Sequence, residues 1–83
     1  MINTLRLSEL AISKPARITA IQSSESDRQR LYALGIHEEM DVRVLHEGPV
    51  GGDPIAIDLD GHVVALRRAD AANIHVQESQ TDE

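Results

Sequence analysis

The chain has 83 residues and a formal net charge of −6, from 8 Lys and Arg against 14 Asp and Glu, and it contains no Cys, Phe or Trp. This length predicts one small domain with an aliphatic core. The negative balance argues against a protein that binds nucleic acid or anionic membranes, and the lack of cysteine excludes disulfides and thiolate metal sites.

The first fifteen residues predict an entry segment, and a strand follows it. "SEL" (8–10) is typical of a single helical turn, which Pro15 would end, and residues 16–22 are rich in the β-branched side chains of strands. No apolar run approaches the roughly 20 residues that span a bilayer, and the start lacks the pattern of a signal peptide. We therefore expect a cytoplasmic protein.

A short helix is predicted over residues 24–34. Ser24 stands where an N-cap is preferred, and Gly35 stands where a left-handed residue commonly follows a helix. Ile36 would then pack back onto Leu31 in the last turn of the helix.

The remaining sequence predicts four further strands. Residues 40–47 alternate, residues 54–67 are typical of a hairpin around an Asp60-Gly61 turn, and residues 74–76 form a last short strand. Between the last two strands, residues 68–73 predict a turn or a single helical coil. The apolar side chains expected to face inward are Ile18, Ile21, Val42, Val44, Ile55, Ile57, Val64, Leu66 and Val76.

These elements predict an all-β domain in the main, with one short α-helix between strands 1 and 2. Closing its five strands into a small barrel would remove exposed sheet edges. The expected domain covers residues 1–76, and residues 77–83 form a polar, acidic tail that we expect to be disordered.

The segment "GPVGGDPI" (48–55) looks most like a functional loop. A phosphate-binding loop needs a lysine and a hydroxyl between a strand and a helix, whereas Asp53 and Pro54 follow Gly52 here, between two strands. The carboxylate would also repel phosphate. We expect a stiff, exposed hairpin loop that binds no nucleotide and presents a surface to a partner.

Evidence in the sequence for a metal site or an active site is weak. The metal-ligand candidates are His46, Glu47 and His62, but none of the histidines has an HxH or HExxH spacing. We expect no required cofactor, although an adventitious divalent ion between two molecules fits such residues. No serine lies in a GxSxG elbow, so we expect no enzyme. One tyrosine cannot line a groove for proline-rich peptides.

Several segments together resemble the ferrous iron transport A (FeoA) family. They are "LSEL" (7–10), "RQRLYALGI" (28–36), "VRVLHEGPVGGDPIAI" (42–57) and "ALRRADAANIHV" (65–76). Their order and spacing match that family over about residues 5–76.

The sequence departs from the family at its turn glycines. Glycine is usual near the start of the first strand, where this chain has Ser13 and Ala16, and before the second strand, where it has Glu39. The hairpin loop carries Gly51-Gly52 in place of one glycine. These changes concern the geometry of turns.

The resemblance implies an SH3-like β-barrel and a non-catalytic, cytosolic accessory role in bacterial Fe(II) uptake. The family's partner is the FeoB membrane transporter, which carries a cytosolic G-protein domain. A similar barrel ends the iron-dependent repressors, but no helix-turn-helix precedes it here.

The contact region for that partner is our own interpretation of the sequence. We expect it at the helix end and the hairpin loop, at Leu31, Leu34, Gly35, Gly51, Gly52 and Asp53. Core packing is the competing interpretation of Leu31 and Leu34. The alternative function is a carrier or sensor of Fe(II) or another divalent metal.

Overall fold

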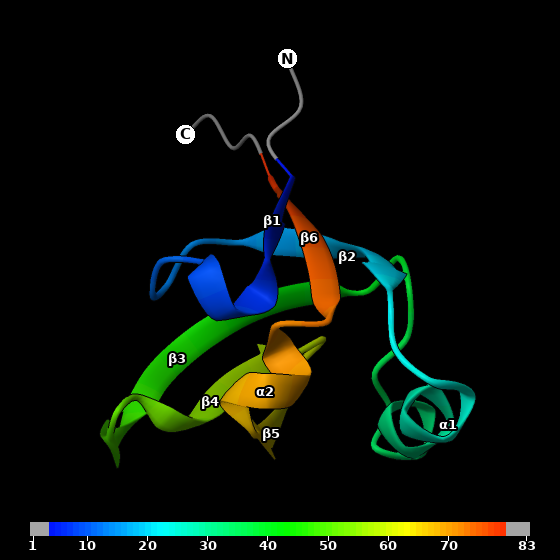
Figure 1. Cartoon of the computed structure of the whole chain (residues 1–83). Helices are drawn as coiled ribbons and strands as arrows, with labels where there is room; N and C mark the ends of the chain where they lie inside the picture. The colour runs from blue at the N-terminus through cyan, green and yellow to red at the C-terminus, as the bar shows by residue number, and fades with distance from the viewer. Residues whose placement is uncertain (1–3, 80–83) are drawn as a thin grey trace.

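Six antiparallel strands form one sheet in the computed structural model, which describes residues 4–79 (Figure 1). The elements in chain order are β1 (Thr4–Arg6), the 3-10 helix η1 (Leu7–Glu9), β2 (Ala16–Ile21), α1 (Glu25–Ala33), β3 (Asp41–Val50), β4 (Asp53–Leu59), β5 (His62–Leu66), α2 (Arg68–Ala71) and β6 (Ile74–Glu78).

The strand order is β1-β6-β2-β3-β4-β5, so β1 and β5 are the two edges of the sheet. The sheet curves around one core, and its two edges are not paired with each other. Between these edges, η1 contacts α2, and α2 contacts β4. The predicted barrel is therefore present as an SH3-like fold, but its sheet stays open between β1 and β5.

The core is aliphatic, as the composition predicts. Its buried side chains are Leu, Ile, Val and Ala from β2 to β6, η1, α1 and α2 and the segments between them, and Leu5 of β1 packs against them partly buried. Eight of the nine residues predicted to face inward are buried. Val64 is the exception: it lies on the edge strand β5 and is half-buried against the core. The buried face of the five predicted strands was thus predicted correctly from the sequence.

Helix α1 ends as the sequence predicts. The N–H of Gly35 donates to the carbonyl of Tyr32, the N–H of Ile36 donates to the carbonyl of Leu31, and Gly35 has φ +91°. These bonds define a Schellman motif, in which a left-handed glycine allows the chain to reverse. Both Leu31 and Ile36 are fully buried, so the motif places the chain's exit from α1 inside the core.

Three sequence predictions need correction. The structure has six strands and not five, because Thr4–Arg6 in the entry segment pairs with β6. β6 extends to Glu78, two residues past the expected domain boundary, and residues 80–83 of the expected tail lie outside the described residues. Most of the predicted loop at residues 48–54 is paired strand, since Val50 faces Asp53 and only Gly51 and Gly52 form the turn.

Two of the positions where the family usually has glycine adopt a positive φ, the backbone conformation that favours glycine. Ser13 has φ +71° and Glu39 has φ +70°, whereas Ala16 is an ordinary residue of β2. The Asp60-Gly61 turn has φ +53° and +95°, which is the two-residue turn predicted for the β4–β5 hairpin.

Candidate functional site

The tip of the β3–β4 hairpin is built by close backbone packing. A Cβ on Gly48 would collide with the carbonyl of Asp53 on the facing strand. Gly51 and Gly52 form the turn with φ +65° and +76°, and Val50 beside them is 78% exposed, the largest exposure among the large hydrophobic side chains of residues 4–79. The tip therefore holds an apolar side chain out in solvent on a well-defined turn.

Arg68, the first residue of α2, fixes this tip from outside the hairpin. Its guanidinium donates to the carbonyl of Gly52 at 3.1 Å and to the carbonyl of Ser8 at 3.0 Å. Its backbone N–H donates to Asp53 Oδ1 at 2.9 Å, and its guanidinium lies 3.7 Å from Glu47 Oε2. One side chain thus joins the hairpin to η1 and α2.

The close approach of Arg68 to the turn also explains why residue 52 is glycine. A Cβ on Gly52 would lie 2.9 Å from the guanidinium of Arg68 and 3.3 Å from Glu47 Oε1, whereas a Cβ on Gly51 would meet nothing within 4 Å. Sequence reasoning missed Arg68, although it belongs to the "ALRRADAANIHV" segment. The signal was present as an arginine at the start of a helical turn, but its partners are 15 to 60 residues away.

The six predicted contact residues fall into two separate regions. Gly51 and Asp53 are exposed and Gly52 is half-buried at the hairpin tip. Leu34 is 46% exposed and Gly35 half-buried at the end of α1, which stands on the opposite side of the molecule from the tip (Figure 1). Since Leu31 has 0% exposure, it belongs to the core, and its prediction as a surface contact is wrong.

The predicted metal-ligand candidates do not converge. His46 faces Ala56 across β3 and β4, His62 faces Leu59 across the β4–β5 hairpin, and Glu47 lies beside Arg68. No group of three or more His, Asp or Glu side chains within residues 4–79 is placed to hold a metal ion. The partner that the structure gives Glu47 is the guanidinium of Arg68.

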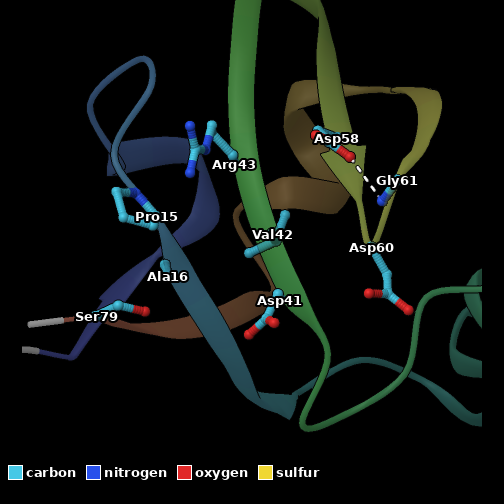
Figure 2. A pocket seen from close by; sticks show the side chains of 9 residues that line it. All are labelled: Pro15, Ala16, Asp41, Val42, Arg43, Asp58, Asp60, Gly61 and Ser79. Carbon is cyan, nitrogen blue, oxygen red and sulfur yellow. Dashed lines mark hydrogen bonds between the residues drawn. The ribbon is translucent and has the colours of Figure 1, made fainter. Parts of the chain in front are cut away.

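An open pocket of about 400 Å³ lies where β2 and β3 diverge (Figure 2). These strands pair only through Ala16 with Val42 and Arg17 with Asp41. The pocket is lined by Pro15, Ala16, Asp41, Val42, Arg43, Asp58, Asp60, Gly61 and Ser79. Its three carboxylates outnumber its one guanidinium, so the pocket disfavours phosphate. It contains none of the contact residues that the sequence predicted.

A second polar cluster surrounds the one tyrosine of the chain. The ring of Tyr32 stacks on His37 at 5.0 Å between centroids, and its hydroxyl lies 3.2 Å from Arg28 and from both carboxylate oxygens of Glu38. These contacts join α1 to the turn that follows it. Tyr32 therefore supports the helix end and contributes no stacking platform to the sheet.

The ion pair between Arg30 and Asp70 holds α1 against α2. Both terminal nitrogens of Arg30 donate to the Asp70 carboxylate, at 3.0 and 3.1 Å. Asp70 is 8% exposed, and the hydrogen bonds from Arg30 lower the pKa of its carboxyl below the usual range, although burial alone would raise it. The same arginine also contacts Asp27 on its own helix.

The fold and the anchored hairpin together define a small SH3-like domain with an exposed tip. No helix within residues 4–79 is long and apolar enough to cross a membrane. A sequence model of the FeoA domain matches residues 5–78. The chain therefore belongs to the FeoA family.

Solved structures agree with this assignment. A solution structure of FeoA from Chlorobium tepidum is 33% identical, with a TM-score of 0.83, over 95% of this chain and 74% of that one. FeoA of Stenotrophomonas maltophilia, solved in complex with zinc and described as a procaryotic SH3 domain protein, is 30% identical, with a TM-score of 0.70, over 92% of this chain and 88% of that one.

More distant structures share the fold alone. IdeR of T. acidophilum is 20% identical, with a TM-score of 0.78, over 95% of this chain and 36% of that one. Among curated proteins, none matches this sequence. The family is linked to ferrous iron transport, as the names of its solved members state.

Proposed function

We propose that this protein is a non-catalytic accessory protein of bacterial ferrous iron uptake, and that it docks from the cytoplasm on the G-protein domain of a FeoB-type transporter. Membership of the FeoA family supports the iron-transport role. The docking role has separate support in the hairpin tip, which is the observation that carries the proposal.

The tip has the properties of a preorganised contact. Val50 is the most exposed large hydrophobic side chain of residues 4–79, and Pro49 beside it is also exposed. Arg68 fixes the turn that follows through the carbonyl of Gly52. A rigid apolar tip loses little conformational entropy when a partner buries it, so even a small contact gains affinity. An exposed valine on a mobile loop would add less affinity, because the loop would lose more conformational entropy on binding.

The experiment compares two exposed side chains in a binding assay with the transporter's isolated cytosolic domain. Val50→Glu places a charge at the tip, and Leu34→Glu places the same charge at the end of α1, the other region that the sequence predicted. Both side chains are exposed, so both variants should keep the fold, which a thermal melt checks.

We expect Val50→Glu to lower the affinity at least tenfold and Leu34→Glu to leave it unchanged. The reverse result would move the contact to α1. Unchanged binding by both variants, or no binding by the native chain, would overturn the proposed docking.

The proposed role requires no cofactor. A carrier or sensor of Fe(II) needs ligands that converge, and none do so within residues 4–79. Isothermal titration with Fe(II) and with Zn(II) tests this point. We expect no tight one-to-one binding, whereas a tight site lost in His46→Ala or His62→Ala would favour the carrier or sensor function.

A further inference from the structure

Strand β5 leaves one edge of the sheet without a partner strand. It pairs with β4, and no other backbone hydrogen bond within residues 4–79 involves His62–Leu66. The opposite edge, β1, is three residues long and contains Arg6. The two edges of the sheet are therefore unequal, and β5 is the longer one.

β5 also lacks the features that usually protect an edge. Its sequence is HVVAL, with no Asp, Glu, Lys, Arg or Pro, and its pairing with β4 runs without a bulge. Natural proteins block an exposed edge with charges, prolines or bulges, because unpaired N–H and C=O groups otherwise accept another strand. A regular, uncharged edge with a valine that is 71% exposed is a docking feature by this criterion.

The turn determines which groups of β5 face outward. In a two-residue hairpin, the residues that flank the turn form a hydrogen-bonded pair, and bonded pairs alternate along the strands. Leu59 and His62 flank the Asp60-Gly61 turn, so His62, Val64 and Leu66 use their backbone groups toward β4. The N–H and C=O groups of Val63 and Ala65 consequently point to the free edge.

We propose that β5 pairs with β5 of a second copy of this chain, antiparallel and centred on Val64, to form a symmetric dimer. In this register Val63 of each copy faces Ala65 of the other, and these are the residues whose backbone groups are free. The register also covers all five residues of β5 on both chains. Val64 faces Val64, so no charge within the strand faces a like charge.

The charges beside β5 favour the same occupant. An antiparallel pairing brings the Asp60-Gly61 turn, which precedes β5 in one copy, next to Arg67, which follows β5 in the other. Asp60 therefore approaches the exposed Arg67, whereas the guanidinium of Arg68 already donates to Gly52 and Ser8 of its own chain. The twofold symmetry repeats the attraction between Asp60 and Arg67 at the other end. A different partner would need its own acidic and basic groups at this spacing, whereas a second copy supplies them. This inference does not depend on the proposed docking on the transporter.

Sedimentation equilibrium from about 10 µM to about 1 mM tests the dimer, since a small edge interface is expected to be weak. The native chain should change from monomer toward dimer over this range. Val63→Pro should remain monomeric, because it removes an outward N–H and no bond to β4. Val63→Thr, which keeps both the N–H and the β-branched shape, should still dimerise.

A second measurement keeps the test decisive if Val63→Pro fails to fold. Amide hydrogen exchange of the native chain should slow at Val63 and Ala65 as the concentration rises, while Val64 stays equally protected throughout. Arg67→Glu should weaken the dimer, because it places a carboxylate near Asp60 of the other copy. A native chain that is monomeric at about 1 mM, or a dimer whose Val63 and Ala65 amides do not change, overturns the proposal.

Discussion

Arg30 and Asp70 form a bidentate ion pair across 40 residues of sequence. Helix α1 lies to one side of the sheet, so few of its side chains can enter the core, and Leu31 is its one fully buried residue. The ion pair supplies a second attachment, because it connects Arg30 of α1 to Asp70 of α2. The position of α1 thus depends on the apolar contacts of Leu31 and the partly buried Tyr32, and on one charged contact.

We expect this ion pair to make the stability of the protein sensitive to acid. The pKa of Asp70 is lowered in the folded chain, so its carboxylate contributes stability above its unfolded pKa of about 3.9, and that contribution is lost as the pH falls through the folded value. Asp70→Asn should therefore melt earlier than the native chain at pH 7. The difference should shrink below about pH 4.

The expected cost of Asp70→Asn at pH 7 is about 1 kcal/mol, since the side chain of Arg30 is 43% exposed and water screens the pair. Asp27→Asn is the matched control, because Asp27 contacts the same guanidinium but is itself 46% exposed. It should cost less. If the two variants lose the same unfolding free energy, the burial of Asp70 does not strengthen its ion pair with Arg30.

Substitution of Glu39 by glycine should stabilise the protein. Glu39 has φ +70°, and a left-handed backbone costs a residue other than glycine about 1–2 kcal/mol. Glycine removes this cost but adds about 0.4–1 kcal/mol of unfolded-state entropy. The net gain in unfolding free energy should be about 0.5–1 kcal/mol by urea denaturation. Glu39→Ala keeps the strain and should show no gain.

The two glycines of the hairpin turn allow the contribution of Arg68 to be measured. Gly51→Ala and Gly52→Ala introduce the same strain at φ +65° and +76°, but only the second Cβ meets the Arg68 guanidinium. Gly52→Ala should therefore destabilise the protein more than Gly51→Ala. In an Arg68→Ala background, the difference between the two variants should shrink to what the contact with Glu47 leaves, which a double-mutant cycle in urea measures.

Local features of this fold were predictable because the residues that determine them are adjacent in sequence. Gly35 and Ile36 indicated the helix end, Asp60-Gly61 indicated the turn, and alternation indicated which face of each strand is buried. Ser13 and Glu39 were visible in the sequence as departures from the family's usual glycines. The structure shows that both residues keep the positive φ that glycine favours.

Other features depend on residues that are far apart in sequence, and no pattern indicated them. The strand Thr4–Arg6 exists because β6 is available to pair with it. The sequence predicted only a turn or helical coil over residues 68–73, yet Arg68 and Asp70 each bind a group from a distant element. Leu31 was assigned both to the core and to a partner surface, because a single leucine near a helix end fits either.

Leu31 and Leu34 now provide a matched test of how α1 is held. They lie three residues apart at the same end of the helix, but Leu31 is fully buried and Leu34 is 46% exposed. Leu31→Ala removes core packing beside Ile36 and should lower the unfolding free energy by about 2–5 kcal/mol. Leu34→Ala should change it by less than about 0.5 kcal/mol. Urea denaturation with a probe of global unfolding measures both. If Leu31→Ala costs as little as Leu34→Ala, the apolar contact contributes little, and the ion pair between Arg30 and Asp70 must hold α1 in place.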